Sequence, residues 1–337
     1  MGTIFKLCSK IKHGKMICRF KRLRISVPVF GACAMSRALM GGLFHTKGDE
    51  DVKYYLKIAG TAQKQNNPRD AENYYHMALH SADQLFKKKE IDPTKYRLLR
   101  VYVYDAMANM AYNSGDYGKA ERLYKETMKL LLAMGRGKTD NAMLEISLKL
   151  ANMYMVMEMP VEAESGFNFV IDSLEEKIKN KTEEFLAEEE NCYGLLGIGC
   201  ENYAKYLIGK ENHTQAESLL KKAEEIARKY LGEKHPQRLV LLNDIASVQI
   251  HRQDYAEAEK SLTAALKIGE DIDDNYLPLL YCNMGSLHLR TGGYDKAMEW
   301  CQRAYELGTE RKNKSVARNA LICMKKAEAE AEKENST

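Results

Sequence analysis

A column of alanines recurs six times along this chain, at intervals of 39 to 53 residues. Very small residues also recur twelve positions before each alanine, and mostly bulky residues recur four positions after it. Two antiparallel helices approach closely only where the facing side chains are small, and bulky residues fill the space beyond such a contact. The three columns therefore predict six helical hairpins, each holding one copy of the pattern.

The column members can be read directly from the sequence. The alanines are Ala71, Ala120, Ala163, Ala216, Ala258 and Ala297. The earlier small residues are Ala59, Ala108, Ala151, Ala204, Ala246 and Gly285. The later residues are Tyr75, Tyr124, Phe167, Leu220, Leu262 and Cys301. In the clearest copy, residues 104–128, Gly115 and Tyr117 mark the turn between the two helices.

Composition supports an all-α fold. The chain is rich in Ala, Leu, Glu, Lys and Met and contains only six prolines, which favours helices. Five of these prolines are expected in the turns or at helix starts, so that none interrupts a predicted helix. They are Pro68, Pro93, Pro160, Pro236 and Pro278.

The hairpin pattern resembles the tetratricopeptide repeat. The resemblance covers residues 52–310 with about six repeats and implies a right-handed superhelical stack, an α-solenoid. The spacing exceeds the usual repeat of about 34 residues, so longer helices or extra turns are expected. The longest interval contains residues 173–190, which predict one charged helix. Residues 311–337 predict a C-terminal capping helix and a charged tail, because a terminal repeat needs a polar outer face.

Charge is distributed very unevenly between the beginning of the chain and the rest. Residues 1–48 contain ten Lys or Arg and no Asp or Glu, whereas the whole chain carries a net charge of +4. The remaining residues are therefore acidic overall, which argues against a nucleic-acid-binding surface. Apolar residues alternate with the basic ones in the first part of this stretch. Residues 1–48 thus predict a largely disordered mitochondrial import leader.

Two other interpretations of this leader remain open. Residues 25–44 have about the length of a membrane-spanning helix. Pro28 and Arg37 interrupt that segment, and its Gly, Ala and Ser residues dilute its hydropathy. Membrane association of the leader, or a simple disordered tail, are the alternatives to import.

The eight cysteines show no spacing typical of a disulfide framework, and none forms a Cys-x-x-Cys pair. The pattern predicts free thiols in a reducing compartment, a condition that the mitochondrial matrix meets.

Four segments carry a more specific resemblance. They are YDAMANMAY (104–112), DNAMLEISLKLANMY (140–154), SLEEKI (173–178) and GEKHPQ (232–237). In this order they resemble a family of mitochondrial tetratricopeptide repeat proteins. The resemblance implies a protein of the inner mitochondrial membrane on its matrix side. It further implies association with respiratory complex III, including its Rieske iron-sulfur subunit, and a role in assembly and upkeep through clearance of N-terminal fragments of that subunit.

No group of residues predicts catalysis, a cofactor or a metal site. His76 and His80 lie one helical turn apart behind Glu72, a spacing that can hold a metal ion. Two surface histidines are the simpler interpretation. A non-enzymatic protein that binds other proteins is therefore expected.

Binding is expected in a groove lined by the first helix of each repeat. Amide side chains there can hydrogen-bond the backbone of an extended peptide, and Tyr adds apolar area. The candidate residues are Tyr102, Asp105, Asn109, Glu145, Asn152, Glu201, Lys205, Asn243 and Ser247. The equivalent groove positions lack the lysine with which some tetratricopeptide domains bind a C-terminal carboxylate, so that kind of ligand is disfavoured.

A cytoplasmic cargo adaptor similar to kinesin light chains is the alternative function. Repeats of about 42 residues and the recurring Asn202, Asp244 and Asn283 favour it. Such an adaptor would need a coiled coil with sustained heptads, and no heptad segment precedes the repeats.

Overall fold

The computed structural model describes residues 49–272 and 275–335, and these residues form fourteen helices and no strand. In chain order the helices are α3 (Glu50–Lys64), α4 (Pro68–Lys87), α5 (Pro93–Ser114), α6 (Tyr117–Ala133), α7 (Asn141–Val156), α8 (Pro160–Asn180), α9 (Glu183–Ala187), α10 (Glu189–Gly209), α11 (His213–Leu231), α12 (Pro236–His251), α13 (Tyr255–Ile272), α14 (Leu277–Arg290), α15 (Tyr294–Glu310) and α16 (Lys314–Asn335). The prediction of an all-α fold is confirmed.

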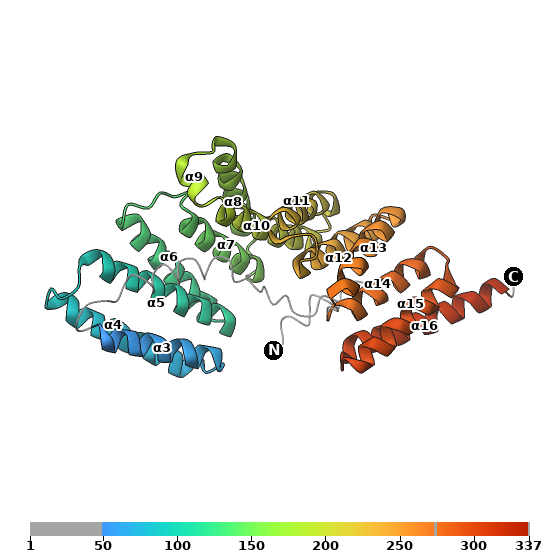
Figure 1. The fold of residues 1–337 in the computed structure, drawn as a ribbon, viewed down its shortest axis with the longest axis horizontal. Helices are drawn as coiled ribbons and strands as arrows, with labels where there is room; N and C mark the ends of the chain where they lie inside the picture. The colour runs from blue at the N-terminus through green and yellow to red at the C-terminus, as the bar shows by residue number, and fades with distance from the viewer. Residues whose placement is uncertain (1–48, 273–274, 336–337) are drawn as a thin grey trace. The chain divides into compact units, whose positions relative to one another are not determined.

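The helices pack as consecutive antiparallel hairpins (Figure 1). Helix α3 packs against α4, α5 against α6, α7 against α8, α12 against α13 and α14 against α15. We call the first helix of each hairpin the A helix and the second the B helix. Helices α10 and α11 are the A and B helices of the fourth repeat, and α16 follows the last hairpin and packs against both α14 and α15.

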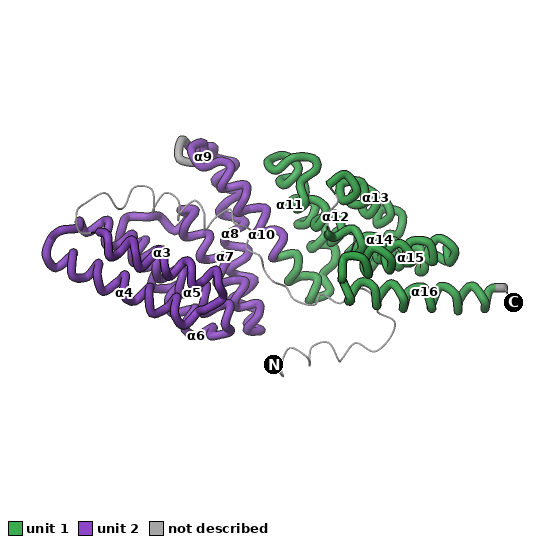
Figure 2. Tube along the Cα trace, turned by 60° about the horizontal axis from the view of Figure 1, so that its bottom comes forward, with its two compact units in different colours: residues 1–26, 203–337 green, residues 27–202 purple. Residues whose placement is uncertain are grey.

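The chain divides into two compact units, coloured separately in Figure 2. The described residues up to Asn202 form the N-terminal unit, and those from Tyr203 onward form the C-terminal unit. The division falls within α10. Helices α3 to α9 therefore belong to the first unit, and α11 to α16 belong to the second.

The small columns lie at the contacts between helices, as predicted. All twelve residues of the two small columns are buried, and so are all six residues of the bulky column. Gly166 of α8 shows how close one contact is, because a Cβ atom added there would lie 2.8 Å from the Cβ of Ala151 on α7. Side-chain size thus sets the distance between the helices of this hairpin.

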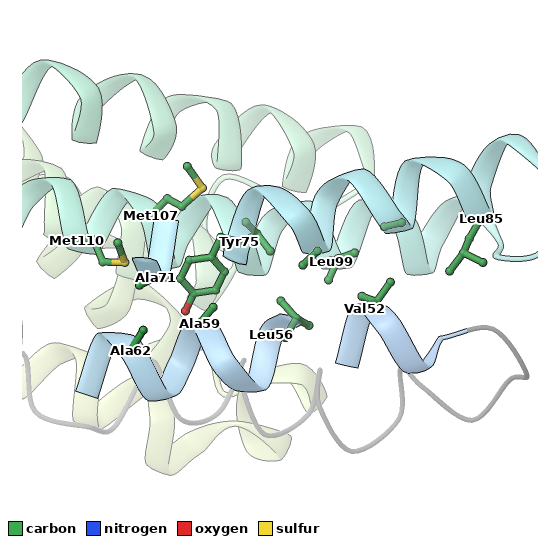
Figure 3. Packing of buried hydrophobic residues seen from close by; sticks show 13 residues of the cluster. Val52, Leu56, Ala59, Ala62, Ala71, Tyr75, Leu85, Leu99, Met107 and Met110 are labelled. Atoms are coloured by element: carbon green, nitrogen blue, oxygen red, sulfur yellow. The ribbon is translucent and has the colours of Figure 1, made fainter. Parts of the chain in front are cut away.

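The first core cluster illustrates this packing (Figure 3). It is formed by residues of α3, α4 and α5. Tyr75 of α4 is almost fully buried beside Ala59 and Ala71, and its hydroxyl donates a hydrogen bond to Gln63 Oε1 at 3.0 Å. The bulky ring fills the space that the small residues leave, while its polar end is satisfied.

Each A–B turn contains one residue in the left-handed region, seven positions after the earlier small column. These residues are Asn66, Gly115, Glu158, Glu211, Gln253 and Gly292, with φ between 59° and 83°. A B helix begins two positions later in every repeat. Prolines begin α4, α5, α8 and α12, and Pro278 is the second residue of α14, which confirms the predicted proline placement.

The prediction of one charged helix over residues 173–190 is wrong. Helix α8 ends at Asn180, where Lys181 takes a left-handed conformation with φ of 43°. Thr182 then caps the short helix α9 by accepting a hydrogen bond from the Phe185 backbone N–H. A left-handed residue followed by a new N-cap ends one helix and begins another, so the segment folds as two helices.

The expectation that all cysteines are free is also wrong. Cys301 of α15 and Cys323 of α16 form a disulfide, with their Cα atoms 6.3 Å apart. Cys192, Cys200 and Cys282 are buried and are not disulfide-bonded. Spacing along the chain could not show the pairing, because the two cysteines meet only when α16 packs against α15.

The predicted leader, residues 1–48, lies outside the described residues. That range includes residues 25–44, the segment considered above as a membrane-spanning helix. Among the helices that the structure does describe, none combines the length and the apolar character required to cross a bilayer.

Candidate functional site

The predicted groove residues lie on four successive A helices. Tyr102, Asp105 and Asn109 are on α5, Glu145 and Asn152 on α7, Glu201 and Lys205 on α10, and Asn243 and Ser247 on α12. The structure brings some of them together within each unit. In the N-terminal unit they join an ionic network, and in the C-terminal unit they join an amide pair.

Lys149 of α7 is the centre of the network in the N-terminal unit. Its ammonium donates hydrogen bonds to both carboxylate oxygens of Asp105, at 2.8 and 3.1 Å, and lies 3.0 Å from Glu145 Oε1. Asn109 donates to Asp105 Oδ2 at 3.0 Å and accepts from the Tyr124 hydroxyl at 2.7 Å. We call these five residues the Lys149 cluster. Its members come from three helices, α5, α6 and α7.

Electrostatics keep Lys149 positively charged. Burial would lower the pKa of Lys149, whose side chain is only 7% exposed, but the neighbouring Asp105 and Glu145 carboxylates outweigh burial and raise that pKa. The Lys149 ammonium also lies 6.0 Å from the centre of the Tyr124 ring, a distance at which the ring face attracts a cation. The ammonium therefore has two carboxylates and one aromatic face as neighbours.

Asn152, one turn beyond Lys149, has a buried side-chain oxygen that no donor of the described residues satisfies. Its side chain is buried, yet Oδ1 has no hydrogen-bond partner in the described part of the chain. Tyr102 is half-buried on the preceding A helix, and burial raises its pKa. A buried acceptor without a donor is uncommon and calls for an explanation.

The C-terminal unit holds a separate polar pair. Asn283 Nδ2 of α14 donates to Asn243 Oδ1 of α12 at 2.6 Å. The Ser247 hydroxyl donates to the Asn243 backbone carbonyl at 3.0 Å, so it bonds within its own helix. On α10, Glu201 of the N-terminal unit and Lys205 of the C-terminal unit are both half-buried. The Asn243–Asn283 pair joins the successive A helices α12 and α14 through side-chain amides.

Glu217 of α11 is the centre of a second ionic network in this unit. It accepts hydrogen bonds from Gln249 Nε2 at 3.0 Å and Arg252 at 2.7 Å, and it lies 2.8 Å from the Lys221 ammonium. Burial would raise the pKa of Glu217, but hydrogen bonds from Lys221 and Gln249 outweigh burial and lower it. Gln249 also accepts from the Ser261 hydroxyl of α13. These bonds tie α11, α12 and α13 together.

Sequence reasoning missed Lys149. It stands two positions before the small residue of its A helix, the same position as Asn202, Asp244 and Asn283. Its spacing of four from Glu145 was a further signal, since such residues are neighbours on a helix face. The positions one turn before Asn109 and Asn152 are Asp105 and Leu148 and hold no lysine, and the hydrogen-bond donors of the adjacent Lys149 are directed to carboxylates.

The remaining candidates for chemistry are arranged as ordinary polar contacts. His76 lies 3.5 Å from Glu72, which also bonds Lys119. In residues 49–272 and 275–335, no group of three or more His, Cys, Asp or Glu is placed to hold a metal ion. The polar residues of the A helices are suited to hydrogen bonding and ion pairing with a bound chain.

Comparison with solved structures supports the fold class. The structure of BtubC (BKLC) from P. vanneervenii matches with a TM-score of 0.59 and 17% identity, over 72% of this chain and 91% of that one. Aspartyl phosphate phosphatase F from Bacillus subtilis matches with a TM-score of 0.57 and 15% identity, over 89% and 76% of the two chains. At these identities the likeness concerns the fold alone.

Comparison with sequences gives the family. Tetratricopeptide repeat models match residues 200–271 and 279–307. Human tetratricopeptide repeat protein 19, mitochondrial, is 33% identical over 263 residues, which are 77% of this chain and 67% of the human protein. The Drosophila melanogaster homologue is 25% identical, over 75% of this chain and 65% of its own length. With its all-α stack of helical hairpins, this chain belongs to the tetratricopeptide repeat protein 19 family.

Proposed function

We propose that this chain is a non-enzymatic scaffold that acts in mitochondria, on the matrix side of the inner membrane, by holding a segment of respiratory complex III. The observation that carries this proposal is the 33% identity over 77% of the chain to a human protein that is named as mitochondrial. The basic, acid-free residues 1–48 agree with import, because the membrane potential draws positive charge inward.

The proposed role is assistance in the assembly and upkeep of complex III, through clearance of N-terminal fragments of its Rieske iron-sulfur subunit. The polar A helices support action by binding. They present amides, carboxylates and Tyr102 along successive repeats, and such groups bind extended peptide backbones.

Affinity capture after crosslinking tests the partner. The full-length chain, tagged at its C-terminus, is expressed in cells and recovered from detergent-solubilised mitochondria. We expect complex III subunits, the Rieske subunit among them, to be enriched over a tagged matrix protein of similar abundance. Recovery of an unrelated complex in their place would overturn the proposal.

Loss of function tests the role. Cells without the protein should accumulate N-terminal Rieske fragments, and expression of the full-length chain should remove them. A chain that is normally imported but leaves the fragments unchanged would argue against this role.

Import has its own test. Residues 1–50 fused to a fluorescent reporter should bring the reporter into mitochondria. The matched control replaces the ten basic residues of the leader with Gln and should leave the reporter in the cytosol. A diffuse signal from the natural leader would contradict the import proposal.

A further inference from the structure

The Lys149 cluster carries one more negative charge than positive. Asp105 and Glu145 are two carboxylates, and Lys149 is the only cation with which they form ion pairs among the described residues. The side chains are mostly withdrawn from water, with 16% of Asp105 and 11% of Glu145 exposed. A partly buried excess charge is unfavourable unless a counter-charge approaches it.

The donors within the cluster are already used. The three N–H groups of Lys149 are directed to Asp105 Oδ1, Asp105 Oδ2 and Glu145 Oε1. The Tyr124 hydroxyl donates to Asn109, and Asn109 donates to Asp105. Glu145 has Lys149 as its only hydrogen-bonding or ion-pairing partner in the described part of the chain. The second oxygen of Glu145 therefore accepts no bond from the described residues.

Asn152 adds an independent observation on the same helix. It lies three residues after Lys149 and seven after Glu145, which places the three residues along one face of α7. Asn152 is 3% exposed, and its Oδ1 has no donor among the described residues. The second oxygen of Glu145 and Asn152 Oδ1 are thus two acceptors on α7 that have no donor among the described residues.

We infer that the Lys149 cluster, through the second oxygen of Glu145, binds the cationic end of a Lys or Arg side chain on the partner segment. This inference rests on the proposed scaffold function and specifies the chemistry of its partner. An Arg suits the site best, because its planar fork of N–H donors matches carboxylate oxygens. The small exposed area of Asp105 and Glu145 admits the tip of a long side chain more readily than a backbone.

Other ligands fit this charge pattern less well. A C-terminal carboxylate would meet two carboxylates and an ammonium whose donors are occupied. A divalent metal ion would be repelled by the Lys149 ammonium. A basic side chain carries one positive charge, which matches the single excess negative charge of the cluster, and it can bind the second oxygen of Glu145 while Lys149 keeps its contacts with Asp105.

Selection from a random library of displayed dodecapeptides, with purified full-length protein as bait, tests the inference. We expect the selected peptides to share a Lys or Arg at one position. Replacing that residue with citrulline, which keeps the shape of Arg without its charge, should weaken binding by about tenfold or more. Selected peptides without a shared basic residue, or citrulline peptides of equal affinity, would overturn the inference, and so would a selection that yields no binder.

Two variants show whether the preference for Arg over citrulline depends on the Lys149 cluster. Glu145→Gln removes the charge of the carboxylate whose second oxygen has no partner among the described residues, with little change in volume, and should abolish the preference for Arg over citrulline. Glu126→Gln removes the same charge from an exposed ion pair on α6 and should leave the preference intact. Circular dichroism shows whether each variant folds, and if Glu145→Gln does not fold, the citrulline comparison on the natural chain still decides.

The two proposals fail in different ways. If complex III is captured equally well by the natural chain and by folded Glu145→Gln, the scaffold stands and the cationic site is wrong. If citrulline weakens peptide binding but complex III is not captured, the site stands and the proposed partner is wrong.

Discussion

At the residue scale, Lys149 shows how much one buried charge can depend on its partners. Three helices meet around it, and two carboxylates and an aromatic ring surround its ammonium. Such groups are far more sensitive to the loss of a partner than exposed ion pairs, because a buried charge cannot be solvated in its place.

Lys149→Met is therefore expected to lower the free energy of unfolding by about 3 kcal/mol or more, because it leaves Asp105 and Glu145 without a cation. Lys129→Met, which breaks the exposed ion pair with Glu126, should change the free energy of unfolding by less than about 0.5 kcal/mol. Urea unfolding followed by circular dichroism measures both. Equal effects of the two substitutions would mean that the cluster contributes no more than a surface pair.

Glu217 predicts a pH dependence. Its folded pKa lies below the unfolded value of 4.5, so its contribution to stability is present above pH 4.5 and is lost as the pH falls through the folded pKa. Glu217→Gln should destabilise the protein near neutral pH, and its deficit in melting temperature should shrink as the pH falls below 4.5. The exposed Glu257→Gln serves as the control and should show no such convergence. A deficit that stays constant with pH would refute this role.

At the scale of the helices, small residues set the distance between A and B helices. Gly166 of α8 faces Ala151 of α7, and a Cβ at position 166 would need its neighbours to shift. Gly60 of α3 has open space where its Cβ would lie. Both glycines are helical and belong to the N-terminal unit.

These two glycines are expected to respond oppositely to alanine. Gly166→Ala should destabilise the protein by about 1 to 3 kcal/mol through overpacking. Gly60→Ala should stabilise it by about 0.5 to 1 kcal/mol, because alanine reduces the freedom of the unfolded chain. Thermal unfolding of both variants gives the sign of each effect. A stabilising Gly166→Ala would show that α7 and α8 are not held at this distance by side-chain size.

The turns offer a second test at this scale. Glu158 and Gly115 occupy the same left-handed turn position in two repeats, with φ of 60° and 83°. Glu158→Gly should stabilise the protein by up to about 1 kcal/mol, since glycine adopts this conformation without steric cost. Gly115→Ala should destabilise it by about 1 kcal/mol for the same reason. Midpoints of urea unfolding measure both, and effects of the same sign would contradict a shared turn geometry.

At the scale of the whole molecule, each helix contacts mainly the helices that are close to it in sequence. Stability in such arrays is nearly a sum of local terms, so a local change should stay local. The Cys301–Cys323 disulfide is well placed to test this, since it joins the last B helix to α16 and lies in the C-terminal unit.

Reduction of this disulfide should remove about 3 kcal/mol of stabilisation, the value expected for a cross-link between residues 22 positions apart. Hydrogen exchange should then rise in α15 and α16 and stay unchanged in α3 to α8. In Cys323→Ser, addition of a reductant should cause no further change. Exchange that rises throughout the described chain would mean that the two units unfold together.

The sequence by itself determined the all-α fold, the number and register of the hairpins and the starts of the proline-headed helices. Those features depend on side-chain size and backbone restriction, which are properties of each residue and are visible as columns. The column of Ala71 and its equivalents predicted buried contacts, and every member is buried. The family could also be named from short segments such as residues 140–154.

Only the tertiary structure decided which side chains meet across helices. It joined Lys149 to Asp105, left Asn152 Oδ1 without a donor and paired Cys301 with Cys323. It also placed Glu158 in a left-handed turn that its residue type does not suggest, and it ended α8 at Asn180. These outcomes depend on distances between residues far apart in the chain, and a linear pattern of residue types does not contain those distances.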